Sequence, residues 1–238
     1  MTLRKHLLTS LATLAAIGSL NTLNAAELSI EIENLTNGIT FTPFIIAAHS
    51  EGTHLFQSGQ AANPEIQAIA EGGDISGAVT LLTSINADIF ENPAGGLLGP
   101  GTATAEFNLS TSTDNTQLSI ASMLLPTNDG FAGLDAWTIP TEAGTYTVYL
   151  NAYDSGTEAN DEIVNGGGAP NTPGIPVAPG GDAGTGGTGV TTTETNTTVH
   201  IHRGVLGDTD PTGGNSDLDS TIHRWLNPVV KVTVTVAE

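Results

Sequence analysis

Apolar and polar residues alternate through several short segments of this chain, and this period of two constrains the fold more than any other feature. In residues 27–36 (ELSIEIENLT) every second side chain is apolar for most of the length. Such alternation is typical of a strand with one face in a core and one in solvent. The other segments predicted as strands are 38–50, 102–110, 117–125, 144–153, 197–203 and 229–236.

One segment has the signals of a helix. Asn63 is a suitable N-cap, Pro64 is favourable in a first turn, and the glycines at 72 and 73 are typical of a helix end. Short strands at regular spacing with one short helix predict an all-β protein, an antiparallel β-sandwich.

The chain ends and one internal stretch set the predicted domain boundaries. Arg4 and Lys5 precede an apolar stretch and small residues at 25 and 26, which predicts a signal peptide over residues 1–25. Residues 165–189 are rich in Gly and Pro and are interpreted as a long flexible loop. We therefore expect one domain over residues 26–238, secreted or periplasmic, with no membrane span.

Charge and cysteine content exclude several function classes. The chain has 5 Lys and Arg against 25 Asp and Glu, a net charge of −20. Such a surface repels nucleic acid and anionic lipid and attracts cations. The absence of cysteine excludes disulfides, thiolate metal sites and cysteine nucleophiles.

Carboxylates gather at three loop segments. One follows the strand at 117–125 and contains Asp129 and Asp135; the second is NAYDSGTEANDE at 151–162, with Asp154 at a strand end; the third is GDTDPTGGNSDLD at 207–219. Oxygen-rich loops of this kind suit calcium (Ca2+), although none matches an EF-hand loop. A solvated acidic turn is the alternative reading of each.

Several motifs occur in an order that resembles one family. They are IAAHSEGTHLFQSGQAA with IQAIAEGGD (46–74), LLPTNDGFAGLDAW (124–137), TYTVYLNAYDSGTEAN (145–160) and the closing HRWLNPVVKVTVTV. Together they resemble the spondin N-terminal domain family from about residue 27 to residue 238. This resemblance implies an eight-stranded antiparallel β-sandwich similar to C2 modules, with calcium bound at one end, and a non-catalytic role in adhesion or matrix binding.

The resemblance also implies particular calcium ligands. Asp129 and Asp154 occupy the acidic positions of the second and third motifs. The third ligand is placed on Asn108, and Glu106 lies on the same face of that predicted strand. Asp135 is expected to hydrogen-bond within its own loop instead. The partner is expected to be an extracellular protein or polysaccharide surface.

The histidines leave an enzymatic alternative open. His200 and His202 lie two apart in a predicted strand and so on one face, and His223 follows later. Three imidazoles could hold a transition metal for a small hydrolase. His49 and His54 are interpreted as structural. The remaining alternative is an exported structural protein without a specific ligand.

Overall fold

The computed structural model describes residues 25–238. The predicted signal peptide therefore lies outside the described residues, apart from its last residue. No helix within the described part is long and apolar enough to cross a membrane.

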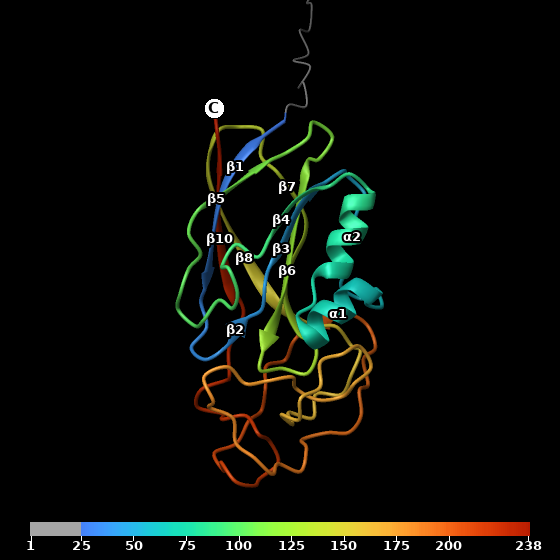
Figure 1. The fold of residues 1–238 in the computed structure, drawn as a ribbon, viewed down its shortest axis with the longest axis vertical. Helices are drawn as coiled ribbons and strands as arrows, with labels where there is room; N and C mark the ends of the chain where they lie inside the picture. The colour runs from blue at the N-terminus through green and yellow to red at the C-terminus, as the bar shows by residue number, and fades with distance from the viewer. Residues whose placement is uncertain (1–24) are drawn as a thin grey trace, which may run out of the picture.

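Within residues 25–238 the fold consists of ten strands and two short helices, and all strand pairs are antiparallel (Figure 1). The strands are β1 (Glu27–Asn34), β2 (Thr40–Phe41), β3 (Ile45–His49), β4 (Asp88–Glu91), β5 (Phe107–Ser110), β6 (Gln117–Leu125), β7 (Gly130–Thr138), β8 (Gly144–Asp154), β9 (His200–Ile201) and β10 (Val230–Val236). The helices are α1 (Pro64–Gly72) and α2 (Ser76–Ser84).

The strands form one continuous sheet that curls until its edges approach each other. The order is β4-β3-β6-β7-β8-β10-β1-β5, with β2 paired to β6 and β9 paired to β8. The two edges meet where Phe90 of β4 packs against Phe107 of β5, with ring centroids 4.4 Å apart. Asp88 of β4 also accepts a hydrogen bond from the Ser112 hydroxyl at 2.9 Å, just after β5. The sheet is therefore a nearly closed, barrel-like structure.

The all-β antiparallel class predicted from the sequence is confirmed. The finer prediction of an eight-stranded, C2-like sandwich is not confirmed, because the strands form one curled ten-stranded sheet. Alternation does place the core as predicted: in β1 the side chains of Leu28, Ile30 and Ile32 are buried, and the residues between them are less so. The facing residues of β10 show the same pattern.

Two helices cover one side of the sheet, where the sequence predicts only one. α1 begins and ends as predicted, since the Asn63 side chain accepts from the Ile66 N–H at 2.8 Å and Gly73 ends the helix with φ 70°. α2 follows after a short turn. Its N-cap, Ile75, makes no side-chain capping bond, although the Asp74 carboxylate before it accepts from the Ser76 N–H at 2.9 Å.

Long loops after β8 gather at one end of the sheet, at the bottom of Figure 1. Part of the Gly/Pro-rich segment packs there against the rest of the domain. Ile175 is fully buried with Val205 and Leu218 in a small apolar cluster. The Asn171 N–H donates to the buried Glu71 carboxylate of α1 at 2.8 Å. These contacts give the segment a defined course over the end of the sheet.

The pairing between β7 and β8 is short. It covers four residue pairs, from Gly130 opposite Asp154 to Gly133 opposite Asn151, and the two strands then separate. β7 is not among the strands predicted from the sequence, because its residues fall in the acidic loop segment expected after residue 125. Its start nevertheless brings the second and third motifs together at the end of the sheet that the loops cover.

Candidate cation site

Asp129 lies in the tight turn that joins β6 to β7. The Thr127 hydroxyl donates to the Leu124 carbonyl at 2.6 Å and accepts from the Gly130 N–H at 3.0 Å, which fixes the turn. A side chain on Gly130 would lie 2.7 Å from the Thr127 hydroxyl, so the turn requires glycine there. Because Gly130 is paired with Asp154, the turn places Asp129 beside the end of β8.

The Asp129 side chain is fully buried, and only one of its oxygens is satisfied. Oδ2 accepts from the Ser155 hydroxyl and from the Thr157 N–H, both at 2.9 Å, and from the Glu158 N–H at 3.3 Å. Oδ1 has no hydrogen-bond partner within residues 25–238. A buried carboxylate oxygen without a partner is costly and rare in folded proteins.

Glu158 is the second incompletely satisfied carboxylate. Its side chain is 9% exposed, and neither carboxylate oxygen has a hydrogen-bond partner among the described residues. The Asn128 amide and the Gly174 N–H lie close enough to favour its ionised form, but neither reaches hydrogen-bonding geometry. Three carboxylate oxygens, one of Asp129 and two of Glu158, thus have no protein partner among the described residues and are available to a ligand.

Burial and mutual repulsion disfavour ionisation of this pair. Burial raises the pKa of Glu158 to about 8, and the negative charges of Asp129 and Glu71 add to the increase. Burial raises the pKa of Asp129 to about 7, with the Asp154 charge contributing. Two carboxylates with raised pKa values at one place are stabilised in their ionised form by a cation between them.

Asp154 completes the acidic group, but it is better satisfied. Its Oδ1 accepts from the Gly156 N–H at 2.9 Å and its Oδ2 from the Asn160 amide at 2.8 Å. His200 Nε2 lies 3.8 Å from Oδ2. Burial raises the pKa of Asp154, and its hydrogen bond from Asn160 opposes the increase. Each oxygen keeps a second lone pair for a ligand.

The third carboxylate cluster has a different character, because protein groups already satisfy it. Asp208 accepts the N–H groups of Asn215 and Ser216 at 2.9 and 3.0 Å. Asp217 accepts the N–H groups of Val164 and Gly187. These carboxylates hold the loops together and leave little need for a cation.

Asp135 also has a structural role, although not the one expected. It lies on β7 rather than in the loop before it, and it binds a different segment of the chain. Its Oδ1 accepts from the Leu55 N–H at 2.7 Å, and its Oδ2 lies 2.5 Å from His54 Nδ1. The prediction that Asp135 bonds its own loop is therefore wrong: it attaches the loop before α1 to β7.

The structure does not bring Asn108 or Glu106 to the acidic group. The placement of a third calcium ligand on Asn108, with Glu106 beside it, therefore requires correction. Both side chains are exposed at β5, on an edge of the sheet. Through the paired strands Asn108 is level with Thr145 at the start of β8, whereas Asp154 ends that strand. At the rise of an extended strand, the distance along β8 from Thr145 to Asp154 is roughly 30 Å.

Each of the three histidines of the enzymatic alternative has contacts of its own with protein groups. His202 is buried against Trp225, and its Nδ1 accepts from the Gly204 N–H at 3.0 Å. His200 lies beside Asp154, and the Nδ1 of His223 accepts from the Asp219 N–H at 3.0 Å. Among residues 25–238, no three His, Cys, Asp or Glu side chains converge as ready metal ligands.

That last finding also bears on the acidic group. Its carboxylates are not arranged as a complete ligand set, so a bound ion would need further oxygens from the backbone, amides or water. Calcium accepts such mixed oxygen sets in flexible geometry, whereas transition metals prefer imidazole and thiolate ligands. The unpartnered oxygens of Asp129 and Glu158 therefore fit a hard cation such as calcium.

Glu158 is the residue that the sequence analysis did not assign to the site. It was seen only as one carboxylate of the second acidic segment. Its signal is the spacing DSGTE, which puts it four residues after Asp154, and the chain there folds back onto Asp129 in the β6–β7 turn. The turn is visible in the structure because the Thr157 and Glu158 N–H groups both donate to Asp129.

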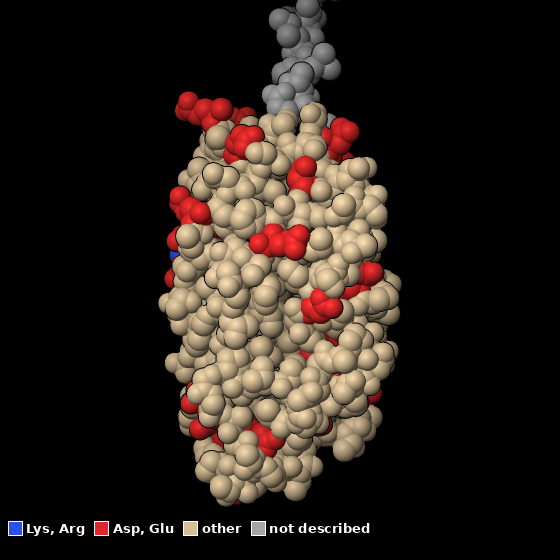
Figure 2. Space-filling view, in the orientation of Figure 1, with Lys and Arg blue, Asp and Glu red and all other residues tan. Residues whose placement is uncertain are grey.

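The fold is an all-β module whose buried, incompletely satisfied carboxylates lie on loops beyond the strand ends. Acidic side chains are spread over the molecular face drawn in Figure 2, with very little basic surface. Residues 33–172 match the Spondin_N family, and the chain belongs to this family. No curated protein matches the chain significantly. The matched range contains Asp129, Asp154 and Glu158, and it ends inside the Gly/Pro-rich segment.

Proposed function

We propose that this chain is a secreted, non-catalytic, calcium-binding module of spondin type that serves in adhesion or matrix binding. The observation that carries the proposal is the buried pair Asp129 and Glu158, whose three unpartnered oxygens lie where the β6–β7 turn meets the loop after β8. Asp154 supplies further oxygen lone pairs beside them. Backbone oxygens and water complete the coordination.

Calcium at this place has a clear physical role. It neutralises carboxylates that otherwise repel each other, and it links the β6–β7 turn to the loop after β8. These loops then present a fixed surface to a partner outside the cell. Membership of the Spondin_N family and the predicted signal peptide support this location.

A thermal melt tests the calcium site. The mature chain is first melted with EDTA, and then with increasing calcium, with magnesium as the control ion. A ligand at 100 times its Kd that binds only the folded state adds about 2.7 kcal/mol, which raises Tm by several degrees in a domain of this size. Saturating stabilisation by calcium and not by magnesium supports the proposal, and no shift with calcium contradicts it.

A further inference from the structure

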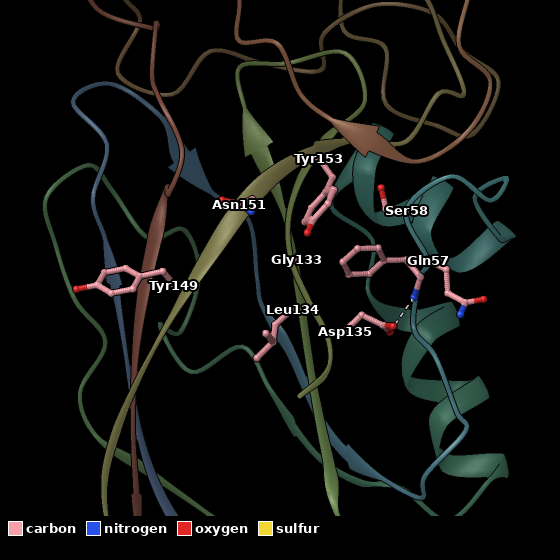
Figure 3. Close-up of a pocket in the computed structure, with 9 residues that line it drawn as sticks. Gln57, Ser58, Gly133, Leu134, Asp135, Tyr149, Asn151 and Tyr153 are labelled. Atoms are coloured by element: carbon pink, nitrogen blue, oxygen red, sulfur yellow. Dashed lines mark hydrogen bonds between the residues drawn. The ribbon is translucent and has the colours of Figure 1, made fainter. Parts of the chain in front are cut away.

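A pocket of about 420 Å3 lies where β7 and β8 separate (Figure 3). β7 contributes the residues around Leu134, β8 contributes Tyr149, Asn151 and Tyr153, and the loop before α1 contributes Phe56 and its neighbours. The pocket has the size of small-molecule sites, and it is open to solvent. Neither the family match nor the cation site accounts for it.

The wall of this pocket beside β7 is firmly held. Asp135 accepts from the backbone N–H groups of Leu55 at 2.7 Å and Phe56 at 3.3 Å. The Phe56 ring packs against Tyr153 with centroids 4.9 Å apart, and it lies so close over Gly133 that a side chain there would meet it at 2.5 Å. The pocket is therefore preformed.

Several polar groups of the pocket remain available to a ligand. Figure 3 marks one hydrogen bond among the lining residues, and it involves Asp135. The Asn151 and Gln57 amides and the hydroxyl of Tyr153 make no hydrogen bond within the described part of the chain, whereas the Tyr149 ring points away from the other lining residues in Figure 3. An amide offers both donors and an acceptor, and a tyrosine hydroxyl offers one donor with acceptor capacity.

The charges around the pocket exclude ionic ligands. No Lys or Arg lines it, so an anion would find no counter-charge. Its one carboxylate, Asp135, is already satisfied by two backbone N–H groups and His54, so a cation would find no available partner there. What remains is a set of neutral donors and acceptors beside the aromatic rings of Phe56 and Tyr153.

This chemistry matches a sugar. Adjacent hydroxyls of a pyranose donate to and accept from one amide, and the C–H face of the ring packs on an aromatic side chain. We propose that the pocket binds a neutral sugar residue of an extracellular polysaccharide. This inference rests on the proposed adhesive function, and it names the class of partner.

The sugar pocket and the cation site are adjacent in the chain but face different ways. Tyr153 and Asp154 are consecutive residues of β8, and consecutive side chains of a strand point to opposite faces. A substitution in one place therefore leaves the chemistry of the other unchanged, and the two proposals can be tested separately.

The test is native gel electrophoresis with calcium present, in gels that contain amylose, dextran, laminarin or galactomannan. Dextran sulfate is the charged counterpart of dextran. We expect at least one neutral polysaccharide to retard the protein, and dextran sulfate not to. Asn151→Ala and Tyr153→Phe should each weaken that retardation about tenfold, since each removes hydrogen bonds to the sugar. Thr147→Ala, an exposed change on the same strand outside the pocket, is the matched control.

The outcomes separate this inference from the calcium proposal. Retardation by none of the four neutral polysaccharides, or retardation that survives both pocket substitutions, overturns the sugar pocket. A calcium shift in the melt without retardation contradicts the pocket and leaves the cation site standing. Retardation without a calcium shift supports the pocket and contradicts the cation site. Circular dichroism of the two variants checks that they are folded.

Discussion

The backbone N–H of Glu158 donates to Oδ2 of Asp129 at 3.3 Å, while the other carboxylate oxygens of the pair have no partner within residues 25–238. The turn after β8 thus fixes the backbone of Glu158 to the side chain of Asp129. At the same time it places two negative groups together in a buried environment. This arrangement is unfavourable without a cation, and the predictions below follow from that cost.

Glu158→Gln is expected to have opposite effects with and without calcium. In EDTA at pH 7 the change removes a buried ionisable group with a raised pKa, and it should stabilise the fold by about 1–3 kcal/mol. In calcium the variant should gain much less than the natural protein, because one ligand charge is lost. Thermal melts of both proteins in both buffers measure the two effects.

Glu106→Gln is the matched control for this pair of effects. It also replaces one Glu by Gln, but at an exposed position far along the sheet from Asp129. Its melts should follow those of the natural protein in EDTA and in calcium. If Glu106→Gln removes the calcium stabilisation and Glu158→Gln does not, the cation site has been placed at the wrong end of the sheet.

The stability of the metal-free protein should fall as pH rises from about 6.5 to 8. Asp129 and Glu158 have folded-state pKa values of about 7 and about 8, above their unfolded values of 3.8 and 4.5, so the folded chain binds more protons in this window. Stability then decreases by about 1.4 kcal/mol per pH unit for each extra proton bound. Calcium at the proposed site would stabilise the ionised carboxylates, so the calcium shift should grow over the same window.

Below pH 6.5 buried histidine opposes this trend. Burial lowers the pKa of His202 to about 3, so the unfolded chain binds a proton there that the folded chain does not. The contribution of His202 makes the free energy of unfolding rise with pH up to the ordinary histidine pKa. Above that pH the contribution no longer changes. Urea unfolding in EDTA at several pH values tests both slopes, and a metal-free stability that increases from pH 6.5 to 8 would contradict the assigned carboxylate environment.

Asp135→Ala should destabilise the domain without altering its calcium response. The change leaves the N–H groups of Leu55 and Phe56 without their acceptor, at a cost of about 1–3 kcal/mol. Asp114→Ala, at an exposed turn, is the control and should change stability little. Melting curves with and without calcium give the result. A lost calcium shift in Asp135→Ala would show that Asp135 belongs to the cation site after all.

Gly133→Ala should destabilise the domain by about 1–3 kcal/mol, because the new methyl group would lie 2.5 Å from the Phe56 ring. Gly99→Ala is the comparison, since nothing lies within 4 Å of the side chain it would add. Denaturant unfolding compares the two variants. Equal stabilities would mean that Phe56 does not pack over β7 as described.

The class of fold was predictable from the sequence because alternation is a local property. β6 was predicted with the bounds that the structure shows, and α1 was recognised from Asn63 at its start and glycine at its end. β7 and α2 were not predicted. β7 contains two glycines and a carboxylate whose partners lie in a distant loop, and the N-cap position of α2 is Ile75, which offers no capping side chain. Closure of the sheet depends on the contact between β4 and β5, which no local pattern indicates.

The candidate site was predictable only in part, for a similar reason. Asp129 and Asp154 stand at recognisable motif positions, and strand pairing brings them to one end of the sheet. Asn108 was assigned by its residue type and order, and the strand register places it at the other end of β8. Glu158 becomes distinct from its acidic neighbours only when burial and hydrogen-bond partners are known. Glu162, four residues later, is also buried, but it accepts from Leu206, Gly207 and Ser216.

The most direct test of the central proposal is the number of calcium ions bound per chain. Isothermal titration of the EDTA-treated and dialysed mature protein with calcium, at pH 8 where the carboxylates ionise most readily, measures this number and the affinity together. The account predicts one saturable calcium site per chain, which Glu158→Gln weakens strongly and Glu106→Gln leaves unchanged. A flat titration of the natural protein would contradict it.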